Sequence, residues 1–149
     1  MRSILLLATV LTAPALLSAQ ANPLVGRWAI EYPGGMQIEN GVPTPIAATG
    51  VLTITSEGDS LIAVLVPGDT SRPTVRMTAP AGNGTKTFVQ RSEATMEMGS
   101  GTETRTATST WILTARGDTL SGTVERAIEG LDLPLGGAIP VTGTRQTSP

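Results

Sequence analysis

The chain contains no cysteine and no histidine among its 149 residues. Without cysteine there is no disulfide framework and no thiolate nucleophile. Without histidine the chain lacks the commonest general base and the commonest side-chain ligand of transition metals. These two absences exclude serine–histidine–aspartate and cysteine–histidine catalysis. We expect neither a cofactor nor a metal site.

Positive charge is also scarce, because Lys86 is the only lysine and ten basic residues are set against twelve acidic ones. A protein that binds nucleic acid needs a basic surface to neutralise phosphates, so we expect no nucleic-acid partner. The preference for arginine over lysine suggests a GC-rich genome and a bacterial source.

The chain has one long apolar run, at residues 4–17, which is too short and too interrupted to span a membrane as a helix. The run follows the positively charged Arg2 and precedes Ala19-Gln20-Ala21, an A-x-A cleavage site. This pattern predicts a signal peptide over residues 1–21 and export to the periplasm or the extracellular space. Residues 22–149 then form a single domain, long enough for one hydrophobic core.

From residue 22 onward the apolar residues follow a period of two, which is typical of strands and not of helices. Threonine is abundant, and glycine and proline punctuate the chain as turn residues. The pattern predicts strands at residues 24–32, two within 50–66, and further strands at 74–79, 86–98, 102–115, 119–127 and 138–145. We therefore expect an all-β fold, a single antiparallel up-and-down barrel of about eight strands, closed by the last strand on the first.

One hairpin pattern occurs twice, with a turn at Gly58-Asp59 and again at Gly117-Asp118. Glycine in the first position favours a two-residue type II′ turn. Such a turn pairs Ser56 with Leu61 and makes one face of the first hairpin apolar. The opposite face is also apolar and carries Val51, Ile62, Val64 and Val66.

Two irregular regions are expected. Pro33-Gly34-Gly35 should end the first strand, which leaves residues 36–45 as a long surface loop with a turn at Asn40-Gly41. A three-residue turn at 99–101 would place the threonines of residues 102–110 inward, whereas the next hairpin places Trp111 inward. Both the threonines and Trp111 can face inward only if the alternation of inward and outward side chains shifts by one residue along this strand. We therefore expect a β-bulge between Ala107 and Thr110.

The segment from Asn22 to Trp28, with Gly26 two residues before the tryptophan, resembles the N-x-x-x-G-x-W opening of lipocalin-like (calycin) barrels. The resemblance implies a barrel in which Trp28 closes one end and packs under an arginine near the last strand, the position of Arg145. It covers these seven residues and the arginine, and no counterpart of the family's T-D-Y loop signature is present. The chain is also similar to short exported bacterial proteins with G-x-W and G-D-x-L-x-G hairpins.

Two non-enzymatic functions remain open. The first is an exported barrel that binds a small apolar ligand in its interior. The residues expected to line that interior are Trp28, Tyr32, Met77, Phe88, Met96 and Met98. The alternative is a structural or protein-interaction module, which binds a partner or a second copy through the outer face of the first hairpin. The residues of that face are Val51, Ile62, Val64 and Val66.

Surface carboxylates raise a third function, an enzyme that acts through a carboxylate pair. The candidates are Glu93, Glu97 and Glu103. They alternate with Arg91 and Arg105 on a face that the pattern assigns to water, which favours a cross-strand lattice of charges. We therefore expect no enzymatic activity.

Overall fold

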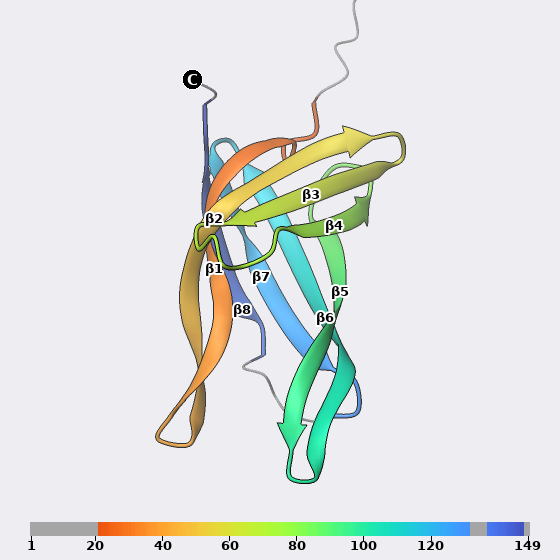
Figure 1. The fold of residues 1–149 in the computed structure, drawn as a ribbon. Helices are drawn as coiled ribbons and strands as arrows, with labels where there is room; N and C mark the ends of the chain where they lie inside the picture. The colour runs from red at the N-terminus through yellow and green to blue at the C-terminus, as the bar shows by residue number, and fades with distance from the viewer. Residues whose placement is uncertain (1–20, 132–136, 148–149) are drawn as a thin grey trace, which may run out of the picture.

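The computed structural model describes residues 21–131 and 137–147. Within these ranges eight antiparallel strands follow one another around a closed barrel (Figure 1), which confirms the predicted fold class. The strands are β1 (Gly26–Glu39), β2 (Val42–Glu57), β3 (Ser60–Pro67), β4 (Val75–Pro80), β5 (Lys86–Met98), β6 (Gly101–Arg116), β7 (Thr119–Ile128) and β8 (Ile139–Arg145). The predicted signal peptide lies outside the described residues except for Ala21. No helix in the described ranges is long and apolar enough to cross a membrane.

The barrel is closed by β1, which pairs with β2 on one side and with β8 on the other. The β1–β8 ladder runs from Trp28 opposite Arg145 to Glu31 opposite Thr142. This pairing removes the two free edges of the sheet, as predicted. The seam between β4 and β5 is the thinnest, because a single residue pair, Thr78 opposite Val89, joins these strands.

The doubled hairpin has the predicted turns and the predicted register. Gly58 and Gly117 have φ angles of +56° and +59°, and the aspartate that follows each glycine has a negative φ, the signature of a type II′ turn. Ser56 lies opposite Leu61, and Ala115 lies opposite Leu120. The turn chemistry therefore determines which face of each hairpin is buried.

The expectation of a loop at residues 36–45 is wrong. β1 continues through Pro33 and Gly35, where a β-bulge shifts the register, and it forms a long hairpin with β2. Asn40 and Gly41 make the two-residue turn, both with left-handed φ angles, of 51° and 78°. The prolines of this part of β2 are tolerated because β3 pairs with β2 only from Gly50 onward, so no neighbouring strand needs their missing N–H groups.

The expected bulge between Ala107 and Thr110 is also wrong. The turn between β5 and β6 contains two residues, not three, because Met98 pairs directly with Gly101. One residue fewer in the turn reverses the alternation of the whole hairpin, so Phe88 lies opposite Trp111 and both face inward without a register shift. The even-numbered threonines of β6 consequently face outward.

Two hairpins extend beyond the barrel as arms at the same end (Figure 1). The β1–β2 arm comprises residues 34–47 and the β5–β6 arm comprises residues 93–106, and within each arm the two strands pair only with each other. The opposite end carries the Gly58-Asp59 and Gly117-Asp118 turns. The barrel therefore has two different ends, one with arms and one with short turns.

The core fills the part of the barrel nearer the short turns. Its inward-facing side chains with no exposed surface are Trp28, Leu52, Ile54, Ala63, Phe88, Leu113, Leu120 and Val124. A side chain beside an interior space large enough for water would keep surface accessible to that water. The centre of the barrel is therefore packed with side chains, as in other close-packed protein interiors.

Gly122 on β7 tests how tightly the wall is packed. A Cβ atom at this position would overlap the carbonyl oxygen of Ile112 on β6, and backbone cannot move aside as a flexible side chain can. We expect Gly122→Ala to lower the free energy of unfolding by about 1–3 kcal/mol in urea titrations. Gly99→Ala, at a turn where a Cβ atom would meet nothing within 4 Å, is the matched control and should change stability by less than about 0.5 kcal/mol. Equal effects of the two substitutions would contradict this packing.

Candidate functional site

The end of the barrel near the short turns is sealed by Arg145 and Trp28. The guanidinium carbon of Arg145 lies 4.2 Å from the centroid of the Trp28 ring, within the range of a cation–π contact. Arg145 also donates hydrogen bonds to the carbonyl oxygens of Val25 (2.9 Å) and Pro23 (2.8 Å), and its Nε lies 3.4 Å from a carboxylate oxygen of Asp118. Trp28 Nε1 donates to the carbonyl oxygen of Leu24 at 2.9 Å. Every polar group of this contact has a partner.

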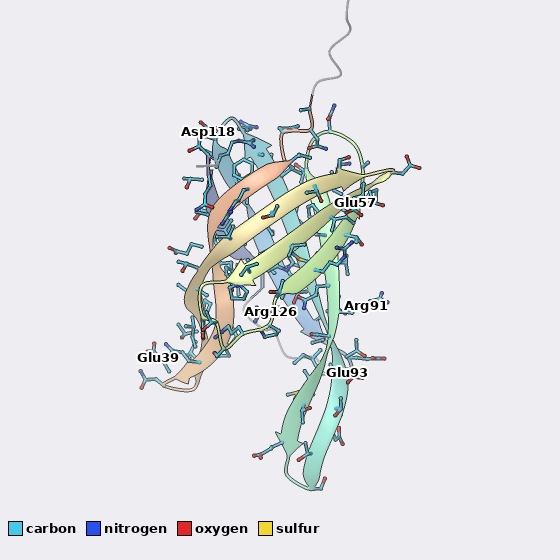
Figure 2. All side chains as sticks on the ribbon, turned by 45° about the horizontal axis from the view of Figure 1, so that its top comes forward. Glu39, Glu57, Arg91, Glu93, Asp118 and Arg126 are labelled. Atoms are coloured by element: carbon cyan, nitrogen blue, oxygen red, sulfur yellow. The ribbon has the colours of Figure 1, made fainter. Side chains whose placement is uncertain are left out.

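The opposite end, between the two arms, gathers three large side chains from three strands. We call Tyr32, Trp111 and Arg126 the open-end cluster. The rings of Tyr32 on β1 and Trp111 on β6 have centroids 5.8 Å apart and are tilted by 44°. Ser109 pairs with Arg126 and Trp111 pairs with Val124, so Arg126 is the diagonal neighbour of Trp111 on the inner face. Figure 2 shows Arg126 at this end of the barrel, between the arms.

Two buried donors of the open-end cluster have no acceptor among the described residues. They are Nε1 of Trp111, whose side chain is 2% exposed, and Nε of Arg126. The one hydrogen bond found for Arg126 is from Nη2 to the carbonyl oxygen of Pro33, at 2.9 Å. A buried donor without an acceptor costs about 1–3 kcal/mol. The open end therefore differs from the sealed end, where the corresponding tryptophan and arginine are fully paired.

A second arginine approaches this cluster from the connection between β3 and β4. Arg72 donates a hydrogen bond to the carbonyl oxygen of Gly34, and its Nε lies 3.5 Å from a carboxylate oxygen of Asp69. Hydrogen bonds from Ser71 hold the pKa of Asp69 below its usual range, so this carboxylate is ionised at neutral pH. Asp69 is exposed to solvent and only partly offsets the positive charge of Arg72.

Burial and charge shift the pKa values of the cluster itself. Burial lowers the pKa of Arg126, and the charge of Arg72 lowers it further. Burial raises the pKa of the Tyr32 hydroxyl above its usual value, although Arg72 and Arg126 oppose the shift. Arg126 nonetheless remains a cation at neutral pH, because a guanidinium group does not lose its proton in proteins. The open end thus places two cations near each other and near a neutral phenol.

Two shallow hollows touch the cluster at Tyr32, and neither is lined by Trp111 or Arg126. One has a volume of about 310 Å³ and is lined by Tyr32, Ala48, Asp69 and Arg72 among others. The other has a volume of about 240 Å³ and is lined by Tyr32, Pro33, Ile139 and their neighbours. Glu31 and Ala47 also line both hollows, so small molecules have access to the rim of the open end around these residues.

The structure divides the residues that the sequence suggested as a ligand lining. Trp28, Met77 and Phe88 are at most 1% exposed and belong to the packed core. Tyr32 is 5% exposed and belongs to the same core, at its open end, whereas Met96 lies on the β5–β6 arm and is half-buried. The side chain of Met98 is outside what the structure describes. These residues do not form one cavity.

Sequence reasoning missed three residues of this end, namely Arg72, Trp111 and Arg126. For Arg126 a signal existed. In β7 the residues Leu120, Gly122 and Val124 face inward, and Arg126 continues that series as a charged residue on an apolar face. For Arg72 no signal existed, because it belongs to a turn whose position over the barrel depends on the tertiary fold.

The apolar outer face of the first hairpin is only partly open. Ile62 is 6% exposed, Val51 and Val64 are half-buried, and Val66 is 51% exposed. Arg76 on β4 and Glu57 on β2 form an ion pair of 3.9 Å whose side chains cross β3 at the level of Ile62. A hollow of about 630 Å³ lies beside Val51 on the outer side of β1, β2 and β8.

The three carboxylates considered for catalysis do not converge. Glu93 and Glu97 lie on the outer face of β5, where Figure 2 shows Glu93 directed away from the barrel. Glu103 lies opposite Met96, on the other face of the arm, and accepts hydrogen bonds from Arg105. In the described part of the chain, no group of acidic side chains is arranged to hold a metal ion.

Comparison of the chain with protein-family models, with curated proteins and with solved structures gave no match.

The sealed end predicts a large cost for the loss of Arg145. Arg145→Ala removes the contact with Trp28 and the charged hydrogen bonds to the chain around Pro23, so we expect a loss of about 2–4 kcal/mol in the free energy of unfolding. Arg27→Ala, at an exposed position of β1, should change it by less than about 0.5 kcal/mol. Urea denaturation followed by tryptophan fluorescence measures both. A loss below 1 kcal/mol for Arg145→Ala would be inconsistent with a structural role of this seal.

The open end predicts an unusual titration for Tyr32, which is the only tyrosine of the chain. Its near-ultraviolet absorbance should show a pKa above 10 in the folded protein and about 10 in concentrated guanidinium chloride. Because the folded pKa is raised, its contribution to stability is complete below about pH 10 and is lost as the pH rises through the folded value. Tyr32→Phe should therefore lose less stability than the wild type over that range. Identical pKa values in the two states would refute the burial of this hydroxyl.

Proposed function

We propose that this protein is an exported, non-catalytic binding protein with a lipocalin-like barrel, and that it holds a small molecule at its open end. The observation that carries the proposal is the difference between the two ends. The sealed end and the centre are filled with packed side chains, whereas the open end has two hollows beside Tyr32 and buried donors that find no acceptor in the described part of the chain.

The lining of the open end suits a ligand that is largely apolar. The rings of Tyr32 and Trp111, which are 5% and 2% exposed, end the core on this side, and Val75 and Ile139 are partly buried side chains packed against it. Binding sites for small molecules commonly combine such a lining with a few polar groups that fix the orientation of the ligand. Ligand bound here would be close to the core without displacing it.

The two arms support the same location. An isolated two-stranded hairpin is marginally stable in water. Among the described residues neither arm pairs with a third strand, so the arms gain stability from whatever lies between them. Met36 and Met96 are half-buried residues on the two arms, and methionine adapts its shape to varied ligands. The arms thus extend the binding surface beyond the end of the barrel.

The outer face of the first hairpin is the weaker candidate for function. Its exposed apolar surface consists mainly of Val66, because the Arg76–Glu57 ion pair crosses the position of Ile62. A partner would have to bind a face on which one valine, and not a contiguous patch, is open to solvent.

Ligand binding at the open end is tested with N-phenyl-1-naphthylamine, an uncharged probe that fluoresces in apolar sites. Ser109 faces inward and is half-buried beside Arg126 and Gln90, so Ser109→Phe should fill the opening. We expect this variant to bind the probe at least about tenfold more weakly, a change of about 1.4 kcal/mol.

The matched control is Thr108→Phe, which adds the same ring to the adjacent residue on the outer face of β6. It should bind the probe as the wild type does, and circular dichroism checks that both variants fold. Equal affinities for Ser109→Phe and the wild type, or no saturable binding to the folded wild type, would overturn the proposal.

A further inference from the structure

We infer that the ligand of the open end is an organic anion, an aromatic or apolar molecule whose acidic group accepts hydrogen bonds from Trp111 Nε1 and Arg126 Nε. This inference rests on the proposed function and names the chemical class of the ligand. Both donors are buried, both belong to inward-facing side chains of adjacent strands, and neither has an acceptor among residues 21–131 and 137–147. Acceptor atoms supplied by a ligand at this end of the barrel would give these donors the partners they lack.

The charge of the site points to an anion and not to a neutral acceptor. Arg126 takes part in no ion pair among the described residues, and its hydrogen-bond acceptor is the uncharged carbonyl oxygen of Pro33. The carboxylate of Asp69 is exposed and is held by Ser71 and Arg72. Two cations and two exposed carboxylates, Asp69 and Glu31, therefore face this end, but neither carboxylate forms an ion pair with Arg126. Burial of a cation is costly unless an anion pairs with it.

The sealed end shows how this chain neutralises the same pair of residue types. There Trp28 Nε1 has the carbonyl oxygen of Leu24, and Arg145 has the carboxylate of Asp118 and several carbonyl oxygens. At the open end, Trp111 lacks the carbonyl and Arg126 lacks the carboxylate. An external carboxylate or sulfonate supplies the missing acceptor and the missing charge together, and charge-assisted hydrogen bonds of this kind are strong.

The apolar part of the ligand follows from the surroundings of the two donors. Trp111 lies beside the Tyr32 ring, and Arg126 donates to the carbonyl oxygen of Pro33. The neighbouring hollow is lined by Tyr32, Pro33 and Ile139 among others. Inorganic phosphate or sulfate would leave these surfaces in contact with water. An acid group attached to an aromatic or apolar body matches both the charge and the lining, so the ligand is of that class.

A matched pair of probes tests the inference. 8-Anilinonaphthalene-1-sulfonate and N-phenyl-1-naphthylamine share the same ring system and differ by one sulfonate group. We expect the wild type to bind the sulfonate at least about tenfold more tightly than the uncharged amine, as expected for one charge-assisted contact in a partly buried site. Raising the salt concentration should weaken binding of the sulfonate and not of the amine.

Arg126→Met keeps most of the apolar stem of this side chain and removes its donors and its charge. We expect the preference for the sulfonate to fall to about twofold or less, with the affinity for the amine unchanged. Arg91→Met, on the outer face of β5 (Figure 2), is the control and should keep the wild-type preference. Arg126→Met also removes a buried cation that has no ion-pair partner among the described residues. The melting temperature of the variant should therefore be no lower than that of the wild type. If it fails to fold, Trp111→Phe removes the other donor and should reduce the preference.

Displacement of the bound probe distinguishes an organic anion from a neutral amide and from an inorganic anion. 1-Naphthoate should displace the bound sulfonate probe, whereas 1-naphthamide and inorganic phosphate at the same concentration should not. Equal binding of the two probes by the wild type would overturn the anion while leaving the proposed function intact, and so would an undiminished preference in Arg126→Met. Failure of both probes to bind the folded protein would overturn the proposed function itself.

Discussion

The strands of this barrel are joined at four places by turns of only two residues, and these turns determine which side chains face inward. Asn40-Gly41, Gly58-Asp59, Gly99-Ser100 and Gly117-Asp118 each hold the flanking residues in direct register. Because side chains alternate along a strand, each turn sets the inner face of its two strands, in β1 only as far as the bulge between Pro33 and Gly35. The core, the seal and the open-end cluster all depend on this alternation.

The alternation gives the two ends of the barrel different chemistry from similar residues. Each end has a tryptophan and an arginine on the inner side of the wall. Near the short turns, Trp28 and Arg145 meet carbonyl groups of the chain and the carboxylate of Asp118. Between the arms, Trp111 and Arg126 retain donors without acceptors. Stability thus comes mainly from the sealed end and the packed centre, and this difference is the basis of the ligand site that we propose at the open end.

The arms and the open end are the parts that sequence reasoning predicted least well. The turn expected at residues 99–101 is one residue longer than the turn in the structure. A one-residue error in a turn exchanges the two faces of a hairpin, so it led to the wrong expectation of a bulge near Thr108. Pro33-Gly34-Gly35 suggested a strand end, but a bulge lets β1 pass through these residues. Both errors concern segments that lack neighbours on one side, where the hydrophobic pattern is weakest.

The sequence by itself determined the all-β class, the order of the strands and the register of the doubled hairpin, because these follow from local alternation and from turn chemistry at Gly58 and Gly117. It also placed Trp28 opposite the position of Arg145 through the resemblance to lipocalin-like barrels. Only the tertiary structure decided that Phe88 and Met77 are core and that Tyr32, Trp111 and Arg126 meet at one end. These residues are far apart in the chain, and closure of the barrel brings them together. Whether a buried donor has an acceptor depends on that arrangement and cannot be read from any local pattern.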